Sequence, residues 1–282
     1  MAETDLRQAK EYGEYMEKIG WRAEKGAFIK QLPLIPFSFI KIQRQAWPLD
    51  FEAIERLAKK YRAVQIKIEP SFGDKTNYRQ FGYKTDSSPL LPTKTIWLDL
   101  RKNHKELLKE MHHKTRYNIR KHEADGQEFE IIRGDKVKDD HLRALYEMYK
   151  KNAKRQGFWG VNFNQLKSLF EAFGGKSYLL KVKGLGGLIL LIHDKTAYYS
   201  HNGTTKEGRQ KFIPTLLTWE AIKLAKKLGC VRFDFEGIAD ERFPITKKWQ
   251  GFTRFKRSFG GVKVEYIGSF SKFNFKELLW PK

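Results

Sequence analysis

Apolar positions in the first 134 residues switch repeatedly between helical and strand spacing. Residues 4–19 and 50–61 carry apolar side chains at helical spacing, and Thr4 and Asp50 are suitable N-terminal caps. A third helical stretch, in two pieces, covers residues 103–124 and ends before Gly126. Strands are predicted at residues 21–25, 28–32, 37–43, 63–68, 93–100 and 128–133. This pattern predicts a mixed α/β unit of roughly 130 residues.

The pattern then starts again after a polar connector at residues 135–140. Helices are predicted at residues 139–154, 164–173 and 213–228, and strands at 178–183, 187–193, 196–202, 231–235 and 262–267. We therefore predict two α/β domains, at residues 1–134 and 135–267, with a tail at 268–282 that packs back on the first domain. The similar order of elements suggests a duplicated architecture, although the two halves share little sequence.

Composition limits the kind of protein. The chain has 282 residues, 40% of them hydrophobic, and no apolar run approaches the roughly 20 residues that a membrane-spanning helix needs. The first 15 residues are charged and lack the apolar core of a signal peptide, so a cytoplasmic protein is expected. The single cysteine, Cys230, excludes an internal disulfide and a cysteine-cluster metal site.

The formal net charge of +22 indicates a polyanionic partner, an acidic membrane surface, or both. Basic residues are densest at residues 101–121, 150–155 and 247–257, and no low-complexity tail carries the charge. This distribution favours a folded basic surface over a disordered nucleic-acid-binding arm. The alternative is a solvated basic surface without a specific ligand.

Residues 196–261 follow the order strand, loop, helix, strand, which is the centre of a GNAT-type acyltransferase fold. A GNAT protein that uses acetyl-CoA needs a glycine-rich turn before this helix, where backbone N–H groups bind the pyrophosphate. Here Phe212 and Pro214 occupy the two glycine positions, and proline donates no N–H. A different activated acyl donor is therefore expected.

Motifs spread over nearly the whole chain resemble the FemABX aminoacyltransferases. They are Gln8…Tyr12-Gly13…Gly20-Trp21, Pro92-Thr93…Leu98-Asp99-Leu100, residues 114–121 (KTRYNIRK), Tyr199…Gly203-Thr204, Pro214…Leu217…Trp219-Glu220-Ala221, Phe233-Asp234-Phe235…Gly237-Ile238 and Gly251-Phe252…Phe255-Lys256…Phe259-Gly260-Gly261. The resemblance implies two tandem GNAT-like domains of mixed α/β sheets that transfer an amino acid from aminoacyl-tRNA to a peptidoglycan precursor. Too few residues separate Arg155 from Tyr178 for the coiled-coil arm of some members, which indicates a short form.

The implied reaction is aminolysis of an ester. An amine of the precursor's stem peptide attacks the aminoacyl carbonyl, and negative charge develops on oxygen in the transition state. By resemblance, Lys256 is the cation that stabilises this charge, and Phe255 shapes the pocket for the acceptor end of the tRNA. The alternative for Lys256 is a solvated lysine in a basic helix with Lys247, Lys248, Arg254 and Arg257.

The resemblance also implies substrate-binding positions. Arg155 stands where the family places a phosphate-binding arginine, which suits the forked hydrogen bonding of a guanidinium. Trp159 and His201 replace family residues that carry aromatic hydroxyls, whereas Tyr199 keeps one. Tyr199 and His201 lie two residues apart on a strand, so both are expected on one face. Lys18 is the available residue for a second phosphate contact near the N-terminus. Solvated or packing roles are the alternatives for Arg155 and Tyr199.

A donor tRNA would be held mainly through its phosphates. The candidate contacts are Lys114, Arg116, Arg120 and Lys121, although these cations could instead support the acceptor site or stay solvated. No metal site or bound cofactor is expected, because aminoacyl-tRNA is a co-substrate and the histidines are scattered. No general base stands out; Asp99 and Asp234 are candidates at strand ends. No stable protein partner is predicted.

Two other functions stay open at this point. One is an acyl-CoA-dependent N-acyltransferase, which the missing glycine turn disfavours. The other is a catalytically silent RNA-binding protein. The acceptor could be the soluble nucleotide-linked precursor, UDP-MurNAc-pentapeptide, or its lipid-linked form, lipid II, and the positive charge would suit peripheral contact with an anionic membrane.

Overall fold

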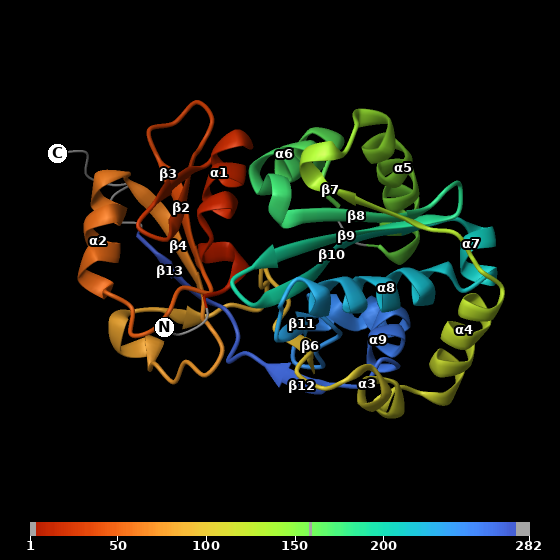
Figure 1. Cartoon of the computed structure of the whole chain (residues 1–282). Coiled ribbons are helices and arrows are strands. Elements are labelled where there is room, and N and C mark those ends of the chain that lie inside the picture. Colours follow the sequence, from red (N-terminus) through yellow and green to blue (C-terminus); the bar gives the residue numbers. More distant parts are fainter. Residues whose placement is uncertain (1–3, 158–159, 275–282) are drawn as a thin grey trace. The chain divides into compact units, whose positions relative to one another are not determined.

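The computed structural model describes residues 4–157 and 160–274 of the chain. Contacts divide the chain into two units. Unit 1 comprises residues 1–93 and 265–282, and unit 2 comprises residues 94–264. Each unit contains one mixed β-sheet with helices packed against it, as Figure 1 shows. Among the described residues, no helix has both the length and the apolar character that crossing a bilayer requires.

Unit 1 is built on a six-stranded sheet with the order β1-β2-β3-β4-β13-β5. Its strands are β1 (Arg22–Glu24), β2 (Ala27–Gln31), β3 (Ser38–Gln43), β4 (Ala63–Glu69), β5 (Lys84–Thr85) and β13 (Phe270–Phe273), and its helices are α1 (Lys10–Lys18) and α2 (Phe51–Lys60). The side chain of Asp50 accepts a hydrogen bond from Ala53 N at 2.8 Å and caps α2, as the sequence predicts. Helix α2 connects the parallel strands β3 and β4 and buries Ile54, Leu57 and Ala58 in the core of the unit.

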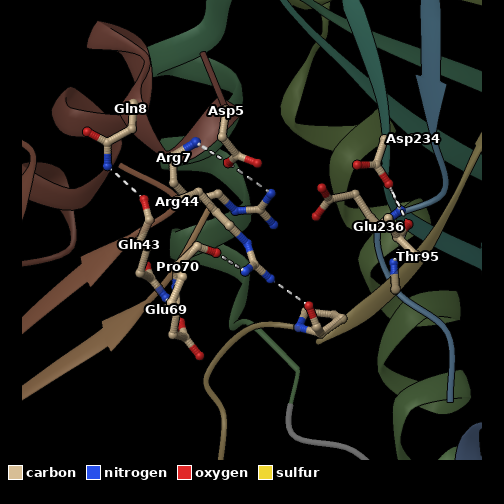
Figure 2. Close-up of polar contacts among 12 residues, drawn as sticks. Asp5, Arg7, Gln8, Gln43, Arg44, Glu69, Pro70, Thr95, Asp234 and Glu236 are labelled. Carbon is tan, nitrogen blue, oxygen red and sulfur yellow. Dashed lines mark hydrogen bonds and ion pairs between the residues drawn. The ribbon is translucent and has the colours of Figure 1, made fainter. Parts of the chain in front are cut away.

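A buried polar network holds the loops of unit 1 (Figure 2). The Arg44 guanidinium donates to the carbonyl oxygens of Pro70 and Pro92, at 2.5 and 2.7 Å, and lies 3.4 Å from the centre of the Tyr266 ring. The Glu69 carboxylate accepts hydrogen bonds from the backbone of residues 90 and 91 and from the side chain of Gln43. Several hydrogen-bond partners for each side chain offset the cost of burying these charges.

Unit 2 contains a seven-stranded sheet with the order β12-β6-β11-β10-β9-β8-β7. Its strands are β6 (Lys94–Asp99), β7 (Glu130–Arg133), β8 (Ser177–Val182), β9 (Gly186–His193), β10 (Thr196–Thr204), β11 (Arg232–Asp234) and β12 (Val262–Glu265). Its helices are α3 (His104–Glu110), α4 (His113–Ala124), α5 (Asp139–Gln156), α6 (Phe163–Phe173), α7 (Lys206–Gln210), α8 (Ile213–Lys227) and α9 (Gln250–Arg257). Helix α8 is buried along most of its length and forms the centre of the core with β8, β9 and β10.

The division of the structure differs from the predicted boundary at residue 134. Strand β6 pairs with β11, so residues 94–134 belong to unit 2. From the tail, β13 pairs with β4 on one side and β5 on the other, inside the unit 1 sheet. The predicted boundary followed a polar connector in the sequence, whereas the observed one follows strand pairs that join residues far apart along the chain.

Candidate active site

The candidate site of unit 2 forms where two parallel strands part. Strands β10 and β11 pair from Thr196 with Arg232 to Tyr198 with Asp234, and β10 then continues to Thr204 without β11 beside it. After β11 the chain turns through Glu236 and Gly237, whose φ angles of 56° and 105° lie in the left-handed region. Such a backbone conformation is uncommon for glutamate and often marks a functional segment.

Lys256 of α9 reaches this turn. Its side chain is 7% exposed, and Nζ donates a hydrogen bond of 2.6 Å to the carbonyl oxygen of Gly237. Nζ also lies 5.0 Å from the ring centre of Phe252 and 5.6 Å from that of Tyr199, within the range of cation–π attraction. Burial lowers the pKa of Lys256 to about 8, while the charges of Glu236 and Asp234 oppose this change. At neutral pH the site therefore holds an ammonium group that is largely withdrawn from water.

Asp234 fixes the turn that meets Lys256. Its buried carboxylate accepts hydrogen bonds from Thr95 Oγ1 at 2.5 Å, from Trp97 Nε1 at 2.8 Å and from Glu236 N at 2.8 Å. Figure 2 shows Asp234 beside Thr95 and the backbone of Glu236. Burial raises the pKa of Asp234 to about 6, with a further increase from the charge of Glu236. With its carboxylate held by three donors, Asp234 is suited to positioning the turn after β11.

The other acidic candidate lies in a different environment. Asp99 forms two hydrogen bonds of 2.8 Å with the guanidinium of Arg101, and these lower its pKa to about 2. The sequence reasoning missed Glu236, which is half-buried and close enough to affect the pKa values of Lys256, Asp234 and His201. The pair Glu-Gly directly after a buried strand was the available signal for it.

The prediction that Tyr199 and His201 share a face is wrong. A β-bulge lies in β10 between Tyr199 and Asn202, where one extra residue opposes β9 and shifts the alternation of side chains. Tyr199 is buried against Phe233 and Phe235, with ring centres 6.4 and 5.7 Å away, and burial raises its pKa.

His201 instead contacts the ring of Tyr149 from α5, with the ring centres 5.3 Å apart. Its Nδ1 lies 2.8 Å from Ser200 Oγ. Burial lowers the pKa of His201 to about 4, against the opposing effect of Glu236, so the imidazole is neutral at pH 7. A neutral imidazole can accept a hydrogen bond from a substrate hydroxyl or amine.

Phe255 packs toward the interior. Its ring meets that of Phe259 edge-on, with centres 5.2 Å apart, and Phe259 in turn contacts Phe235. The aromatic rings that contact the Lys256 ammonium are those of Phe252 and Tyr199. Phe255 therefore supports α9 from the core side.

The remaining predicted substrate-binding residues are spread over both units. Lys18 is exposed in the last turn of α1 in unit 1, and Arg155 is exposed in the last turn of α5 in unit 2. Trp159 lies outside the described residues. The roles of Lys18 and Arg155 in phosphate binding stay predictions.

The four predicted tRNA contacts lie on α4 of unit 2. Lys114, Arg120 and Lys121 are exposed on this helix. Arg116 differs, because its guanidinium donates to the carbonyl oxygens of Lys109 and Met111 and so satisfies the C-terminal end of α3. Three of the four cations thus remain on the solvent side of α4. Within residues 4–157 and 160–274, no group of three or more histidine, cysteine or acidic side chains is arranged to hold a metal ion.

Comparisons with known proteins relate this arrangement to a family. Residues 181–279 match the FemAB family, whereas a comparison with curated protein sequences gave no match. The structure of FemX resembles that of this chain with a TM-score of 0.77 and 17% identity, over 98% of this chain and 94% of FemX.

Two further solved structures have related folds. A putative lysylphosphatidylglycerol synthetase domain from Agrobacterium fabrum gives a TM-score of 0.65 with 13% identity, over 97% of this chain and 91% of that domain. L-PGS from Bacillus licheniformis gives 0.61 with 14% identity, over 92% and 86%. The fold is therefore that of tandem GNAT-like proteins, as the sequence predicts. Lys256 and the turn after β11 both lie within the segment, residues 181–279, that matches the FemAB family.

Proposed function

We propose that the protein transfers an amino acid from aminoacyl-tRNA to the stem-peptide amine of a peptidoglycan precursor. The match of residues 181–279 to the FemAB family supports a transferase that acts in cell-wall or lipid biosynthesis. The proposal of aminoacyl transfer rests mainly on the buried Lys256 ammonium, which lies beside the point where β10 and β11 separate. We place the reaction in the cytoplasm, where charged tRNA is available.

In the proposed reaction, the acceptor nitrogen forms a bond with the aminoacyl carbonyl carbon. The ester bond to the tRNA ribose oxygen then breaks, and the proton lost by the amine ends on that oxygen. Lys256 stabilises the negative charge on the carbonyl or ribose oxygen. This stabilisation is strong because the ammonium is desolvated between Phe252 and Tyr199 and already fixed by Gly237. No bound cofactor takes part in this scheme.

The neighbouring residues have supporting roles in the proposal. Asp234 holds the turn that presents the Gly237 carbonyl oxygen to Lys256, so it positions the ammonium without touching substrate. The neutral His201 is available as a hydrogen-bond acceptor. Arg155 and Lys18 are proposed to bind phosphates of the acceptor.

The exposed cations Lys114, Arg120 and Lys121 are proposed to bind phosphates of the tRNA. Arg116 is already bound to the end of α3, and we propose that it supports this surface from beneath. Such contacts would weaken at high salt without depending on the tRNA sequence.

Coenzyme A is disfavoured as donor by the start of α8. The amides of Thr215 and Leu216 donate to the carbonyl oxygen of Phe212, at 2.9 and 3.4 Å, and the amide of Phe212 donates to Arg209 O at 3.1 Å. Pro214 has no amide hydrogen. Donors that would have to face a pyrophosphate are therefore used within the turn itself, which argues against the acyl-CoA alternative.

A single-turnover transfer assay tests the proposal. Charged tRNAs carrying labelled amino acids would be combined with a nucleotide-linked and a lipid-linked precursor, for the wild type, Lys256→Met and the exposed-lysine control Lys263→Met. We expect transfer by the wild type and the control, and a loss of about 10²–10³-fold in Lys256→Met, as for removal of one oxyanion donor.

The other outcomes separate the alternatives. Unchanged transfer in Lys256→Met would refute the role of this lysine while leaving the reaction in place. Transfer from an acyl-CoA, with heat of CoA binding in calorimetry, would support the N-acyltransferase. Binding of tRNA without transfer to either precursor would support the RNA-binding alternative.

A further inference from the structure

We propose that the β2–β3 loop of unit 1, residues 32–37, inserts into the surface of an anionic membrane. This loop has the sequence LPLIPF and connects two antiparallel strands of the sheet. Figure 1 shows the connection extending beyond the ends of β2 and β3. Leu34 is fully exposed and Ile35 is 46% exposed, with Pro33 and Pro36 exposed on either side.

The loop is a defined structure that presents its apolar residues outward. The amide of Leu32 donates to Phe37 O at 2.9 Å and closes the loop, and Gln31 Nε2 donates to Ile35 O at 3.0 Å. Leu34 has a φ of 64°, a left-handed conformation in which glycine or asparagine costs less than leucine. The chain thus keeps a large apolar side chain at an exposed and unfavourable position, which calls for a functional reason.

Several cations lie at the sheet edge from which this loop extends. Strand β4 runs parallel to β3 and begins at the same edge of the sheet, where Ser38 bonds to the carbonyl oxygens of Tyr61 and Arg62 just after α2. The C-terminal end of α1 reaches the same edge, because Lys30 Nζ donates to Gly20 O at 2.8 Å. Basic residues at this edge are Lys18, Arg22, Lys30, Lys59, Lys60 and Arg62, and acidic residues are Glu17 and Glu24.

The arrangement of these charges favours lipid phosphates as the counterpart. The Arg62 guanidinium lies 5.2 Å from the ring of Phe37 at the base of the loop, and Lys59 is exposed at the end of α2. Glu24 pairs with Lys60 at 2.9 Å, which leaves the edge with a positive balance. Lysine and arginine near an acidic bilayer each contribute about a fivefold gain in binding.

The size of the apolar tip favours a bilayer over a protein partner. Two exposed side chains flanked by prolines form far too small a patch for a stable protein interface, which buries roughly 800 Å² on each partner. An apolar tip beside a cationic sheet edge matches the boundary between acyl chains and acidic headgroups. The loop and the cations tested below, Lys59 and Arg62, belong to unit 1 and are separate from the Lys256 site of unit 2.

Environment-sensitive labelling gives a direct test. The chain has one cysteine, the buried Cys230, so Leu34→Cys can be labelled selectively with NBD. The matched control is Leu228→Cys, at a position 41% exposed at the end of α8 in unit 2. With vesicles of phosphatidylcholine and phosphatidylglycerol, we expect a several-fold rise in NBD emission at position 34 and little change at position 228. Equal responses at both positions, or no response at position 34, would overturn the proposal.

Vesicle co-sedimentation of unlabelled variants separates the apolar and ionic parts. In Leu34→Asn/Ile35→Ser, asparagine suits the left-handed backbone, and binding should fall by at least about tenfold. Lys59→Glu/Arg62→Glu should reduce binding by about tenfold or more, whereas Lys105→Glu/Lys109→Glu, with the same loss of charge, should have a smaller effect.

Specificity for acidic lipid is part of the same test. Binding should weaken at high salt and on vesicles of phosphatidylcholine alone, because the ionic contribution is then screened or absent. Wild-type protein that fails to sediment with acidic vesicles would refute the proposal, as would equal losses in the two charge-reversal variants. Circular dichroism of each variant would show that the fold is retained.

Discussion

Replacing Lys256 with methionine should make the protein more stable relative to wild type at pH 7 than at pH 10. The pKa of Lys256 falls from its ordinary 10.5 to about 8, first because of burial. The folded state therefore binds fewer protons than the unfolded state between these two pH values, and wild-type stability rises with pH across that window. The drop corresponds to about 3 kcal/mol that the charged lysine costs the fold at neutral pH.

Methionine removes this cost but leaves Gly237 O without its donor, a loss of about 1–3 kcal/mol. At pH 7 we expect Lys256→Met to be as stable as wild type or up to about 2 kcal/mol more stable. Raising the pH to 10 should move the difference in unfolding free energy by about 2–3 kcal/mol in favour of wild type. The same variant should lose about 10²–10³-fold in transfer, so Lys256 would be a residue retained at the expense of stability.

Urea unfolding at pH 7, 8, 9 and 10 measures this difference directly. Other lysines titrate in both proteins, so their contributions cancel in the comparison. The exposed control Lys263→Met should differ from wild type by a nearly constant amount at every pH. A difference for Lys256→Met that stays constant to within about 0.5 kcal/mol would refute the reasoning, because it would mean that the ammonium is well solvated in the folded protein.

Three other predictions concern the same unit. Transfer by the wild type should decline above about pH 8, because Lys256 loses its proton and its charge. A pH–rate profile of kcat/KM without this decline would contradict the role of the ammonium. Thr95→Val removes a donor to Asp234 and should lower the unfolding free energy by about 2 kcal/mol, whereas Thr95→Ser should lose less than about 1 kcal/mol in the same urea titration. Gly208→Ala should lower the unfolding free energy by about 2 kcal/mol or more, because a Cβ there would overlap a backbone carbonyl oxygen. Its control is Gly251→Ala in α9, where a Cβ meets open space, and this variant should be neutral or slightly stabilising in thermal unfolding.

Local sequence patterns predicted those parts of the fold that depend on local physics. The predicted helix at residues 213–228 is α8 (Ile213–Lys227), and the predicted strand at 231–235 contains β11 (Arg232–Asp234). Both follow from apolar periodicity and turn residues within a short window. These short windows do not show which strands pair with one another. The boundary between the two units near residue 94 could therefore not be predicted from them.

The sequence pointed to Lys256 of the candidate site but not to the residues around it, and its catalytic role stays a prediction. Lys256 stood out by resemblance, yet its partner Gly237 O lies 19 residues away in the chain, after a turn with unusual backbone angles. The bulge in β10 leaves no mark in the sequence pattern of polar and apolar residues. Simple alternation along the strand therefore placed His201 on the wrong face. Contacts of this kind depend on tertiary packing, which overrides local alternation.

The place of β13 has a consequence for how the protein is made. This strand lies between β4 and β5, yet it is synthesised after every other strand that the described residues form. While the chain emerges from the ribosome, the sheet of unit 1 therefore keeps an open seam, with the edges of β4 and β5 unpaired, through the entire synthesis of unit 2. The amino-terminal unit can complete its sheet only once unit 2 has been made, so strands translated early are among the last to reach their native pairing.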